Sequence, residues 1–433
     1  MKKFIGIAVI GLYSILLLQI FVNSVSQLST MYQQHQLLIS SANGIISFSD
    51  FVRYYACGKI ALSPEAHKCY DAAVQLKYFN EIIFERAGLL IGRPIITHYT
   101  PIVYPLTIPI ALAPINQAFP IWIVGGFAAV AAGFSLALNT GKQRPVWFSL
   151  LAVLGVAATF PTIISLRMGQ PSWFILATEC LYLWAFVRNR QNICGASVAL
   201  LCFKPHYGLY FLLPLVIKKK LPALCSFAVT LGLLLLAAGL IIGIENIINY
   251  PRFVVDTESN LSLLNYGGDK MVSLRFLCSR IFAEALAVKI SLGISLAGLV
   301  SAGALWWKFR LCNVHERWLI GCTVLICLLT SPHIYVYDLA MLGVLAVLLG
   351  ENPVARTSAG RLGCKLFQTL LILYPIVSWI GIMLPSGNTG FPFIAVTYNV
   401  LLLVCALTYV FSGTKARAQK LQSSSMISAG SAL

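Results

Sequence analysis

The first acidic side chain of the sequence, Asp50, lies in the segment SFSDFVRYYACGK, which runs from Ser47 to Lys59. A carboxylate can act as a general base that accepts a proton from a substrate hydroxyl. Arg53, one helical turn further on, can bind a phosphate or keep the carboxylate ionised. The spacing also has a structural interpretation, because Ser47 and Asp50 form the S-x-x-D pattern of a capping box that starts a helix. Both interpretations remain open at this point.

A second candidate, Lys204, begins the segment KPHYG. Pro205 breaks a helix here, between two apolar runs (193–203 and 207–217) that are each too short to cross a bilayer of about 30 Å. A lysine at such a depth is costly unless it has a partner. The neighbouring residues offer no carboxylate. Lys204 therefore either extends toward the interface or receives its counter-ion with a ligand such as a lipid phosphate.

The segment SPHIYVYD places His333 and Tyr337 next to Asp338. A histidine beside a carboxylate can shuttle a proton or bind an anion. Asp338 can equally cap the helix that follows it. Glu179 lies within an apolar run and is expected to have a polar partner. The sequence contains no GxGxxG, Walker or HExxH pattern, so it does not indicate a soluble nucleotide site.

These residues must be positioned by a strongly apolar chain. Of its residues, 58 % are hydrophobic and 10 % charged, with a mean hydropathy of +0.83. A soluble domain carries roughly 25 % charged residues, so this chain cannot cover a water-facing surface. The recurring apolar runs predict an all-α polytopic membrane protein with about 12 transmembrane helices. We place these spans at 4–22, 120–138, 146–166, 173–187, 193–203, 207–217, 222–243, 289–307, 317–331, 336–350, 366–384 and 393–411.

The net charge of +17, from 31 Lys and Arg against 14 Asp and Glu, is distributed unevenly. Most of the basic residues fall in loops on one side of the predicted spans, where only Glu316 and Glu351 accompany them. Excess Lys and Arg in short loops marks the cytoplasmic side of a membrane. Both termini are therefore predicted to be cytoplasmic. The basic excess is a topology signal and does not indicate nucleic acid as a partner.

The same pattern predicts the organisation of the chain. The opening MKKFIGIAVIG lacks a small-residue cleavage site after its apolar run, so we expect an uncleaved first span. The predicted units are the first helix (1–22), an outer loop with juxtamembrane helices (23–119), transmembrane helices with a break at 204–208 (120–243), an outer loop (244–288), C-terminal transmembrane helices (289–411) and a disordered cytoplasmic tail (412–433).

The sequence holds 12 cysteines, most of them in apolar runs, where Cys behaves as a small apolar residue. No CxxC or Cys/His spacing for a metal occurs. Cys57 and Cys69 share the first outer loop and are the pair that can form a disulfide. The sequence leaves open whether they do.

Several segments, taken in order over roughly residues 50–350, resemble motifs of the family-87 glycosyltransferases. These are bacterial membrane enzymes of the GT-C class, which include polyprenyl-phosphate-mannose-dependent mannosyltransferases. SDFVRYYACGKIAL resembles D-F-x-x-Y-Y-x-x-G-x-x-x-L, and YTPIVYPLTIPIALAPI resembles Y-P-P-L…A-P-L. GQPS resembles G-Q-x-N, although Pro171 and Ser172 stand where an Asn usually falls. The K-P of KPHYG and the S-P-H and Y-D of SPHIYVYD complete the set.

The resemblance implies a GT-C fold whose acceptor and donor meet at the outer face of the cell inner membrane. It implies that Asp50 is the general base in an inverting transfer of a hexose, expected to be mannose, from a polyprenyl-phosphate donor to a lipid or glycan acceptor. Lys204 and Arg53 are then expected to bind the donor phosphate, and His333 to lie at the reaction centre. Further residues are expected to bind substrate: Tyr54, Tyr55, Gln170 and Tyr337. We expect no cofactor and no metal, because no carboxylate pair stands near Asp50.

Two other classes of protein compete with this interpretation. A transporter or flippase for a lipid-linked sugar would explain a wet break within the membrane. Transporters tend, however, to show paired broken segments in two related halves, and the sequence indicates one break. A membrane scaffold without a site would leave Lys204 without an explanation.

Overall fold

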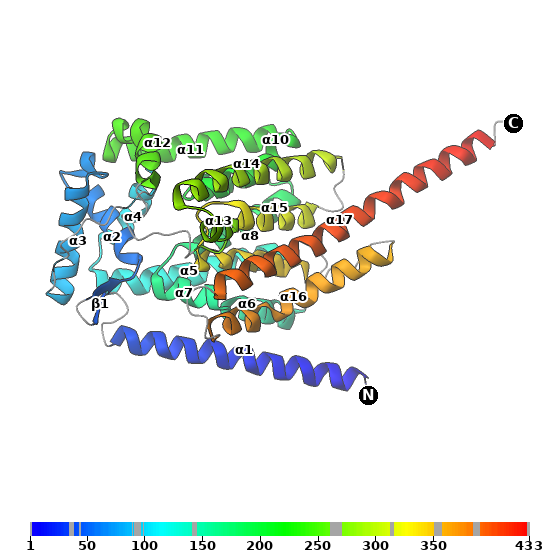
Figure 1. The fold of residues 1–433 in the computed structure, drawn as a ribbon, viewed down its shortest axis with the longest axis horizontal. Helices are drawn as coiled ribbons and strands as arrows, with labels where there is room; N and C mark the ends of the chain where they lie inside the picture. Colours follow the sequence, from blue (N-terminus) through cyan, green and yellow to red (C-terminus); the bar gives the residue numbers. More distant parts are fainter. Residues whose placement is uncertain are drawn as a thin grey trace.

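The computed structural model describes residues 2–33, 39–42, 45–88, 90, 97, 99–140, 145–259, 271–311, 316–349, 357–383 and 390–430. Its helices form an elongated body in which most of them run along the long axis (Figure 1). Both termini lie at one end of this body, and α2, α3 and β1 lie at the other.

The helices and strands follow the chain in this order: α1 (Lys2–Gln33), β1 (Ile39–Ala42), β2 (Ile45–Phe48), α2 (Phe51–Ala61), η1 (Ala66–Lys68), α3 (Ala72–Ala87), α4 (Val103–Ala111), α5 (Ile115–Leu138), α6 (Val146–Ala157), α7 (Phe160–Met168), α8 (Ser172–Val187), α9 (Gln191–Leu201), α10 (Pro205–Ile217), α11 (Leu221–Ile242), α12 (Ile244–Ser259), α13 (Leu274–Ile281), α14 (Glu284–Lys308), α15 (Glu316–Thr330), η4 (Val336–Leu348), α16 (Ser358–Met383) and α17 (Gly390–Gly430). The two strands pair antiparallel as a small hairpin, and the fold is otherwise helical.

The apolar helices make this a polytopic membrane protein. Among the described residues, 6 helices are long and apolar enough to cross a membrane, and α6 with α7 makes 7 if that bent pair is one span. Four shorter apolar helices, α8, α9, α10 and η4, pack among them. Each apolar run predicted as a span contains a helix within the described residues, although about 12 spans were predicted and only 6 or 7 helices are long and apolar enough to cross a membrane. Hydropathy predicts these elements well because apolar side chains must face lipid or each other.

One span departs from its prediction. The run 146–166 was predicted as a single helix, but it bends by 62° between α6 and α7. Thr159 starts α7 by accepting a hydrogen bond from the Thr162 amide, and Pro161 occupies the first turn, where its missing amide proton is tolerated. The break at Lys204 is therefore not the only one in the described chain.

The two ends of the chain also differ from expectation. The first helix extends to Gln33, well beyond the predicted end at residue 22. The predicted disordered tail is wrong for most of its length, since α17 continues to Gly430. The segment KARAQKLQ supplies Ala, Lys, Arg, Gln and Leu, which have high helix propensity and can prolong a helix beyond the apolar span.

The core has two parts. The larger one fills the helical body and centres on α8, α10, α15 and η4. The smaller one lies at the end away from the termini, where α2 packs against α3 and α4 around Phe51, Tyr54 and Tyr104. The candidate site residues come from both sides of the boundary between these cores. Their relative positions therefore depend on how α2 packs against its neighbours.

Gly58 sets the distance between α2 and α4. A Cβ atom at this position would lie 2.5 Å from the Thr107 carbonyl oxygen and 2.6 Å from the Ala111 Cβ. We predict that Gly58→Ala lowers the thermal unfolding midpoint of the purified protein, because overpacking of this kind costs about 1–3 kcal/mol. Gly232→Ala is the matched control, since no atom lies within 4 Å of the added Cβ. An equal midpoint for the two variants would contradict a close α2–α4 contact.

Candidate active site

Asp50 precedes α2, and its side chain does not cap that helix. It lies at the N-cap position but makes no capping hydrogen bond to the backbone. Ser47 belongs to β2, so the predicted capping box is wrong. Gln170 Nε2 instead donates to Asp50 Oδ2, and Arg53 Nε lies 3.4 Å from Oδ1. The Asp50 side chain is 17 % exposed, so a small part of it remains accessible.

Gln170 holds Asp50 from the opposite side of the site. Its Oε1 accepts a hydrogen bond of 3.2 Å from the Tyr54 hydroxyl. The Tyr54 ring in turn stacks on Tyr99, with ring centres 4.5 Å apart and an angle of 5° between the planes. Gln170 is buried, with 3 % of its surface exposed. Because both ends of its amide are engaged, Gln170 orients the Asp50 carboxylate.

A tight turn after α7 brings Gln170 to Asp50. Gly169 ends α7 with a left-handed φ of 62°, and a Cβ there would lie 2.4 Å from the Phe51 Cβ. Only glycine allows this approach without displacing the start of α2. Trp122 Nε1 donates to the Gly169 carbonyl at 3.0 Å and fixes the turn. Trp122 was not among the residues predicted from the sequence, although a tryptophan near an expected membrane boundary is a recognisable signal.

Lys204 and Asp338 form an ion pair within the helical body. Lys204 Nζ lies 2.5 Å from Asp338 Oδ1, and the Asp338 side chain is fully buried. Asp338 Oδ2 accepts a hydrogen bond of 3.1 Å from the Tyr335 amide, so this carboxylate is both a helix cap and an ion-pair partner. The sequence left two alternatives for Lys204, extension toward the interface or a counter-ion supplied by a ligand, and neither included this partner within the chain. The partner comes from a segment distant in sequence, which local patterns do not reveal.

Aromatic side chains connect the Asp50 group with the Lys204 group. Lys204 Nζ lies 5.3 Å from the centre of the Tyr337 ring and 5.7 Å from that of Tyr207. Phe203, next to Lys204, lies 5.9 Å from the Tyr54 ring. The two groups thus form one polar centre where α7 and α9 end and α10 begins.

The electrostatics of this centre agree with the contacts. Burial raises the pKa of the Tyr54 hydroxyl, and the neighbouring Tyr99, Tyr337 and Asp50 raise it further, so Tyr54 stays a neutral hydrogen-bond donor. Burial lowers the pKa of Arg53, but this effect is outweighed, chiefly by the Asp50 carboxylate. Its pKa is therefore raised, and Arg53 remains a cation beside Asp50.

The other candidates lie around this centre in different ways. Tyr55 donates its hydroxyl to the Ala113 carbonyl at 2.8 Å and packs inside the smaller core, which indicates a structural role. His333 lies within electrostatic reach of His206, two residues after Lys204. Glu179 is fully buried in α8, and neither of its carboxylate oxygens has a hydrogen-bond partner within the described part of the chain. The polar partner predicted for Glu179 is absent there.

Cys57 and Cys69 are free, buried thiols in this structure. Burial raises the pKa of each thiol to about 12. They lie in α2 and directly after η1, beneath the site. Among the residues described, no group of three or more His, Cys, Asp and Glu side chains is placed to hold a metal ion.

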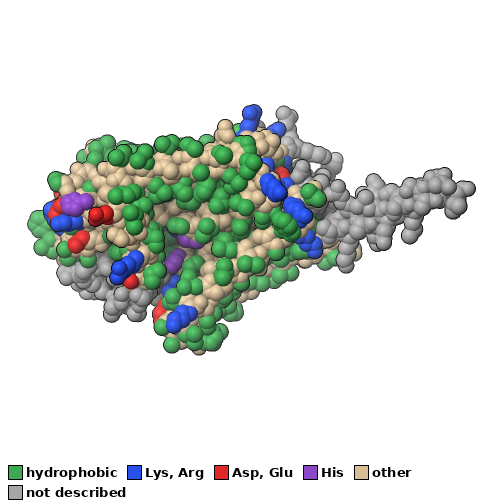
Figure 2. Space-filling model, turned by 90° about the horizontal axis from the view of Figure 1, so that it is seen from above, with side chains coloured by type: hydrophobic (Ala, Val, Ile, Leu, Met, Phe, Trp, Pro, Cys, Tyr) green, Lys and Arg blue, Asp and Glu red, His purple; other side chains and the backbone are tan. Residues whose placement is uncertain are grey.

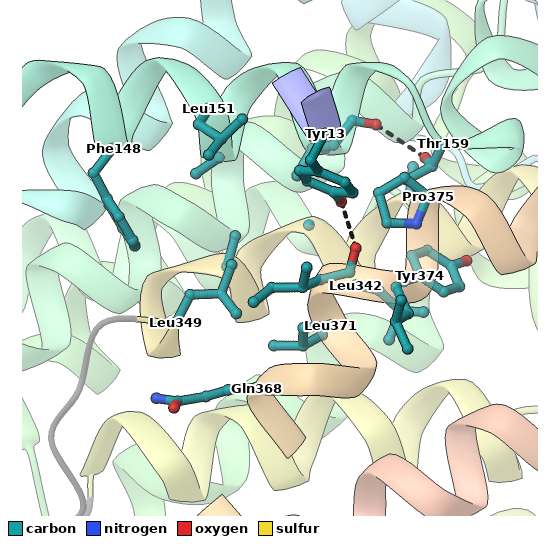
Figure 3. A pocket seen from close by; sticks show the side chains of 18 of the residues that line it. Tyr13, Phe148, Leu151, Thr159, Leu342, Leu349, Gln368, Leu371, Tyr374 and Pro375 are labelled. Carbon is teal, nitrogen blue, oxygen red and sulfur yellow. Dashed lines mark hydrogen bonds between the residues drawn. The ribbon is translucent and has the colours of Figure 1, made fainter. Parts of the chain in front are cut away.

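Two apolar cavities open in the helical body. One, of about 430 Å³, is lined from α4, α5, α8 and α9 and reaches Pro171 and Phe203, the direct neighbours of Gln170 and Lys204. The other, of about 510 Å³, lies between α1, α6, η4 and α16 (Figure 3). Phe148, Leu151 and Leu342 lie around it, and Tyr13 donates its hydroxyl to the Ile372 carbonyl at its edge. Figure 2 shows histidine side chains within a hollow between apolar surfaces.

A helical membrane protein with a polar centre beside an apolar cavity has the features expected of an enzyme that acts on a partly apolar substrate. The model of glycosyltransferase family 87 matches residues 97–332, which is more than half of the chain. The chain therefore belongs to glycosyltransferase family 87 and is a glycosyltransferase. No curated protein matches it. Gln170 and Lys204 lie inside the matched region, whereas Asp50 precedes it and Asp338 follows it.

The Lys204–Asp338 pair predicts an asymmetric response to mutation. Lys204→Met leaves a fully buried carboxylate without its cation, and breaking such a pair costs about 3–5 kcal/mol. Asp338→Asn should cost less, because Lys204 is 17 % exposed and reaches water, while Asn still caps the Tyr335 amide. The double variant should be more stable than Lys204→Met alone in thermal unfolding. Strictly additive losses would contradict a coupled pair.

Proposed function

We propose that the protein transfers a hexose, mannose, from a polyprenyl-phosphate-linked donor to a hydroxyl of a lipid or glycan acceptor. The reaction takes place at the outer face of the cell inner membrane and inverts the anomeric carbon. The observation that carries this proposal is the Asp50 carboxylate, which is held by Gln170 and Arg53 and is joined through aromatic side chains to Lys204. Membership of family 87 gives the reaction class.

Asp50 serves as the general base. An ionised carboxylate has about four lone-pair sites. Gln170 uses one on Oδ2, and Arg53 lies beside Oδ1, so sites remain for an acceptor hydroxyl. As the acceptor oxygen bonds to the anomeric carbon, its proton passes to Asp50. The bond from that carbon to the phosphate oxygen breaks, and its electron pair leaves with the polyprenyl phosphate.

Lys204 and Arg53 stabilise the phosphate that departs. An ammonium group has three hydrogen-bond donors, of which Asp338 takes one. The remaining donors of Lys204 can contact phosphate oxygens as negative charge develops there. His333 is proposed as a second catalytic group beside them, and Tyr337, whose ring lies below the Lys204 ammonium, as a substrate contact. Tyr54 joins them as a hydrogen-bond donor in the centre.

The apolar cavity of about 430 Å³ supports a lipid-linked donor. It ends at Pro171 and Phe203, so a hydrocarbon chain within it would bring its phosphate to Lys204. A donor activated by a lipid carrier also explains how sugar transfer can proceed without a nucleotide-binding motif in the sequence.

A transporter of lipid-linked sugar is the second candidate. The structure weakens one argument against it, because α6 and α7 form a second break besides the one at Lys204. Membership of a glycosyltransferase family favours the enzyme. Movement of labelled lipid across vesicles by the purified protein, without any transfer product, would favour the transporter.

We predict that Asp50→Asn abolishes sugar transfer, while the protein still inserts and unfolds at the wild-type temperature. Loss of a general base typically costs about 10²- to 10⁴-fold in rate. The assay is transfer from a radiolabelled polyprenyl-phosphate sugar by purified enzyme. Glu65→Gln is the matched control, because Glu65 is a carboxylate of the same loop that pairs with Lys77 at the surface. Full activity in Asp50→Asn would remove the proposed base.

We further predict that Gln170→Leu lowers kcat by about 10- to 100-fold and leaves KM nearly unchanged, because a misplaced catalytic group costs about that much. The side chain is buried, and each end of its amide already contacts a neighbouring side chain, Nε2 with Asp50 and Oε1 with Tyr54, so its main effect is to orient Asp50. Tyr55→Phe should keep both constants near wild type. A rise in KM with unchanged kcat would instead assign Gln170 to substrate binding.

A further inference from the structure

A basic cavity of about 780 Å³ lies at the end of the helical body opposite to Asp50. Helices α8 and α10 both begin at the candidate site, next to Gln170 and Lys204, and both end at this cavity. Side chains from three places in the chain line it, among them Asn189, Gln191, Lys219, Lys220, Arg310 and Glu316. Figure 2 shows Lys and Arg gathered at the end of the body from which the C-terminal segment leaves.

The positive charge in this cavity exceeds what its carboxylate can neutralise. Glu316 is paired with Lys218. No ion pair to Lys219, Lys220 or Arg310 occurs within the described residues, and neutral groups hold Lys220 and Arg310. Lys220 donates to Asn189 Oδ1 at 3.2 Å and lies 4.5 Å from the Phe186 ring centre.

Arg310 is held in a similar way. Its guanidinium lies 4.0 Å from the Trp307 ring centre, and it also donates to the Trp307 carbonyl. A cation stacked on an aromatic face is preorganised, so it loses little freedom when an anion arrives. Lys220 and Arg310 are thus positioned, and within the described residues no carboxylate pairs with them or with Lys219, which also lines the cavity.

The backbone at the cavity is also unusual. Asn189 and Lys219, with φ of 54° and 53°, are the non-glycine residues in the left-handed region among those described. Each follows the end of a helix, where glycine is normally preferred. The Lys220 amide bonds back to Leu215 and the Arg190 amide to Ala185, which closes both helix ends. A lysine at this position gives up local stability and adds its charge to the cavity.

The surroundings identify the anion as part of a lipid. The candidate span α11 begins beside the cavity, at Leu221, and the candidate span α14 ends beside it, at Lys308. Leu221, Trp307 and Leu311 are exposed around it. Exposed apolar side chains and a tryptophan next to basic groups are typical of the level of lipid headgroups. A soluble phosphate would have no use for this apolar rim.

We propose that this cavity binds the phosphodiester headgroup of an anionic phospholipid, whose acyl chains lie along α11. A general excess of Lys and Arg on the cytoplasmic side requires many basic residues but no particular arrangement of them. The proposed site, in contrast, requires Lys219, Lys220 and Arg310 to line the same cavity. The proposal is independent of the reaction carried out at Asp50.

The test uses the full chain, purified in detergent and freed of lipid. Its thermal unfolding midpoint is measured against increasing phosphatidylglycerol, phosphatidylcholine with the same acyl chains, or inorganic phosphate. We expect phosphatidylglycerol alone to raise the midpoint. Lys219→Gln/Lys220→Gln should weaken its apparent affinity by about 10- to 30-fold, since each lysine near a lipid surface contributes about one factor of 5.

The matched control is Arg361→Gln/Lys365→Gln, which removes two exposed cations of α16 at the same end of the molecule and should keep the wild-type response. Arg310→Gln offers an independent variant if the double substitution does not fold, and it should also weaken the response. Equal losses in the control pair would overturn the site in favour of general surface charge. A response to inorganic phosphate as strong as that to phosphatidylglycerol would overturn the assignment to a lipid.

Discussion

A buried aspartate that pairs with a lysine from a distant segment is the constraint on which this structure depends. Asp338 is surrounded by apolar helices, and an ionised carboxylate in such a place is stable only with a cation and with hydrogen bonds to its remaining lone pairs. Lys204 supplies the cation and the Tyr335 amide a hydrogen bond. The break between α9 and α10 must therefore lie next to the start of η4. Because Phe203 precedes Lys204 and packs near Tyr54, the same ion pair also constrains where the Asp50 group lies along the helical body.

The contacts of Asp50 argue against a role as a helix cap and leave a chemical role open. A cap would direct its oxygens to the amides of α2, and no such bond is present. The carboxylate faces Gln170 and Arg53 instead, across a boundary between two cores. A side chain that gives up the nearest amides must be held by other partners, and a long-range amide, a glycine turn and Trp122 together do so. Several side chains that together orient one carboxylate are expected where that carboxylate acts on a substrate.

How far the sequence predicts this structure depends on the range of each interaction. The apolar runs became helices because the need to satisfy backbone groups within lipid acts on each run separately. The break at Pro205 was visible for the same reason, since proline acts on its own helix. The partner of Lys204 was not visible, because nothing near it in sequence marks Asp338 as its neighbour. Gln170 was predicted to bind substrate, whereas its contacts with Asp50 and Tyr54, more than a hundred residues away, could not be seen in the sequence. The bend at Thr159 was missed because hydropathy continues smoothly across it, although a threonine two residues before a proline is a helix-start signal.

The two ends of the molecule differ in their balance of positive and negative charge. At one end, tyrosines and a tryptophan surround a single partly exposed carboxylate and a lysine whose charge is already balanced by Asp338. At the other, cations accumulate with one carboxylate among them. A net positive field at the reacting end would hold a phosphate-bearing product and slow its release, whereas a balanced pair contributes hydrogen bonds with little net attraction. In the proposed reaction, Lys204 would therefore stabilise charge as it develops on a leaving phosphate without binding the ground state equally well, which is the condition for an interaction to accelerate a reaction. The surplus positive charge is kept at the far end of α8 and α10, where it can bind an anionic headgroup permanently without any cost to turnover.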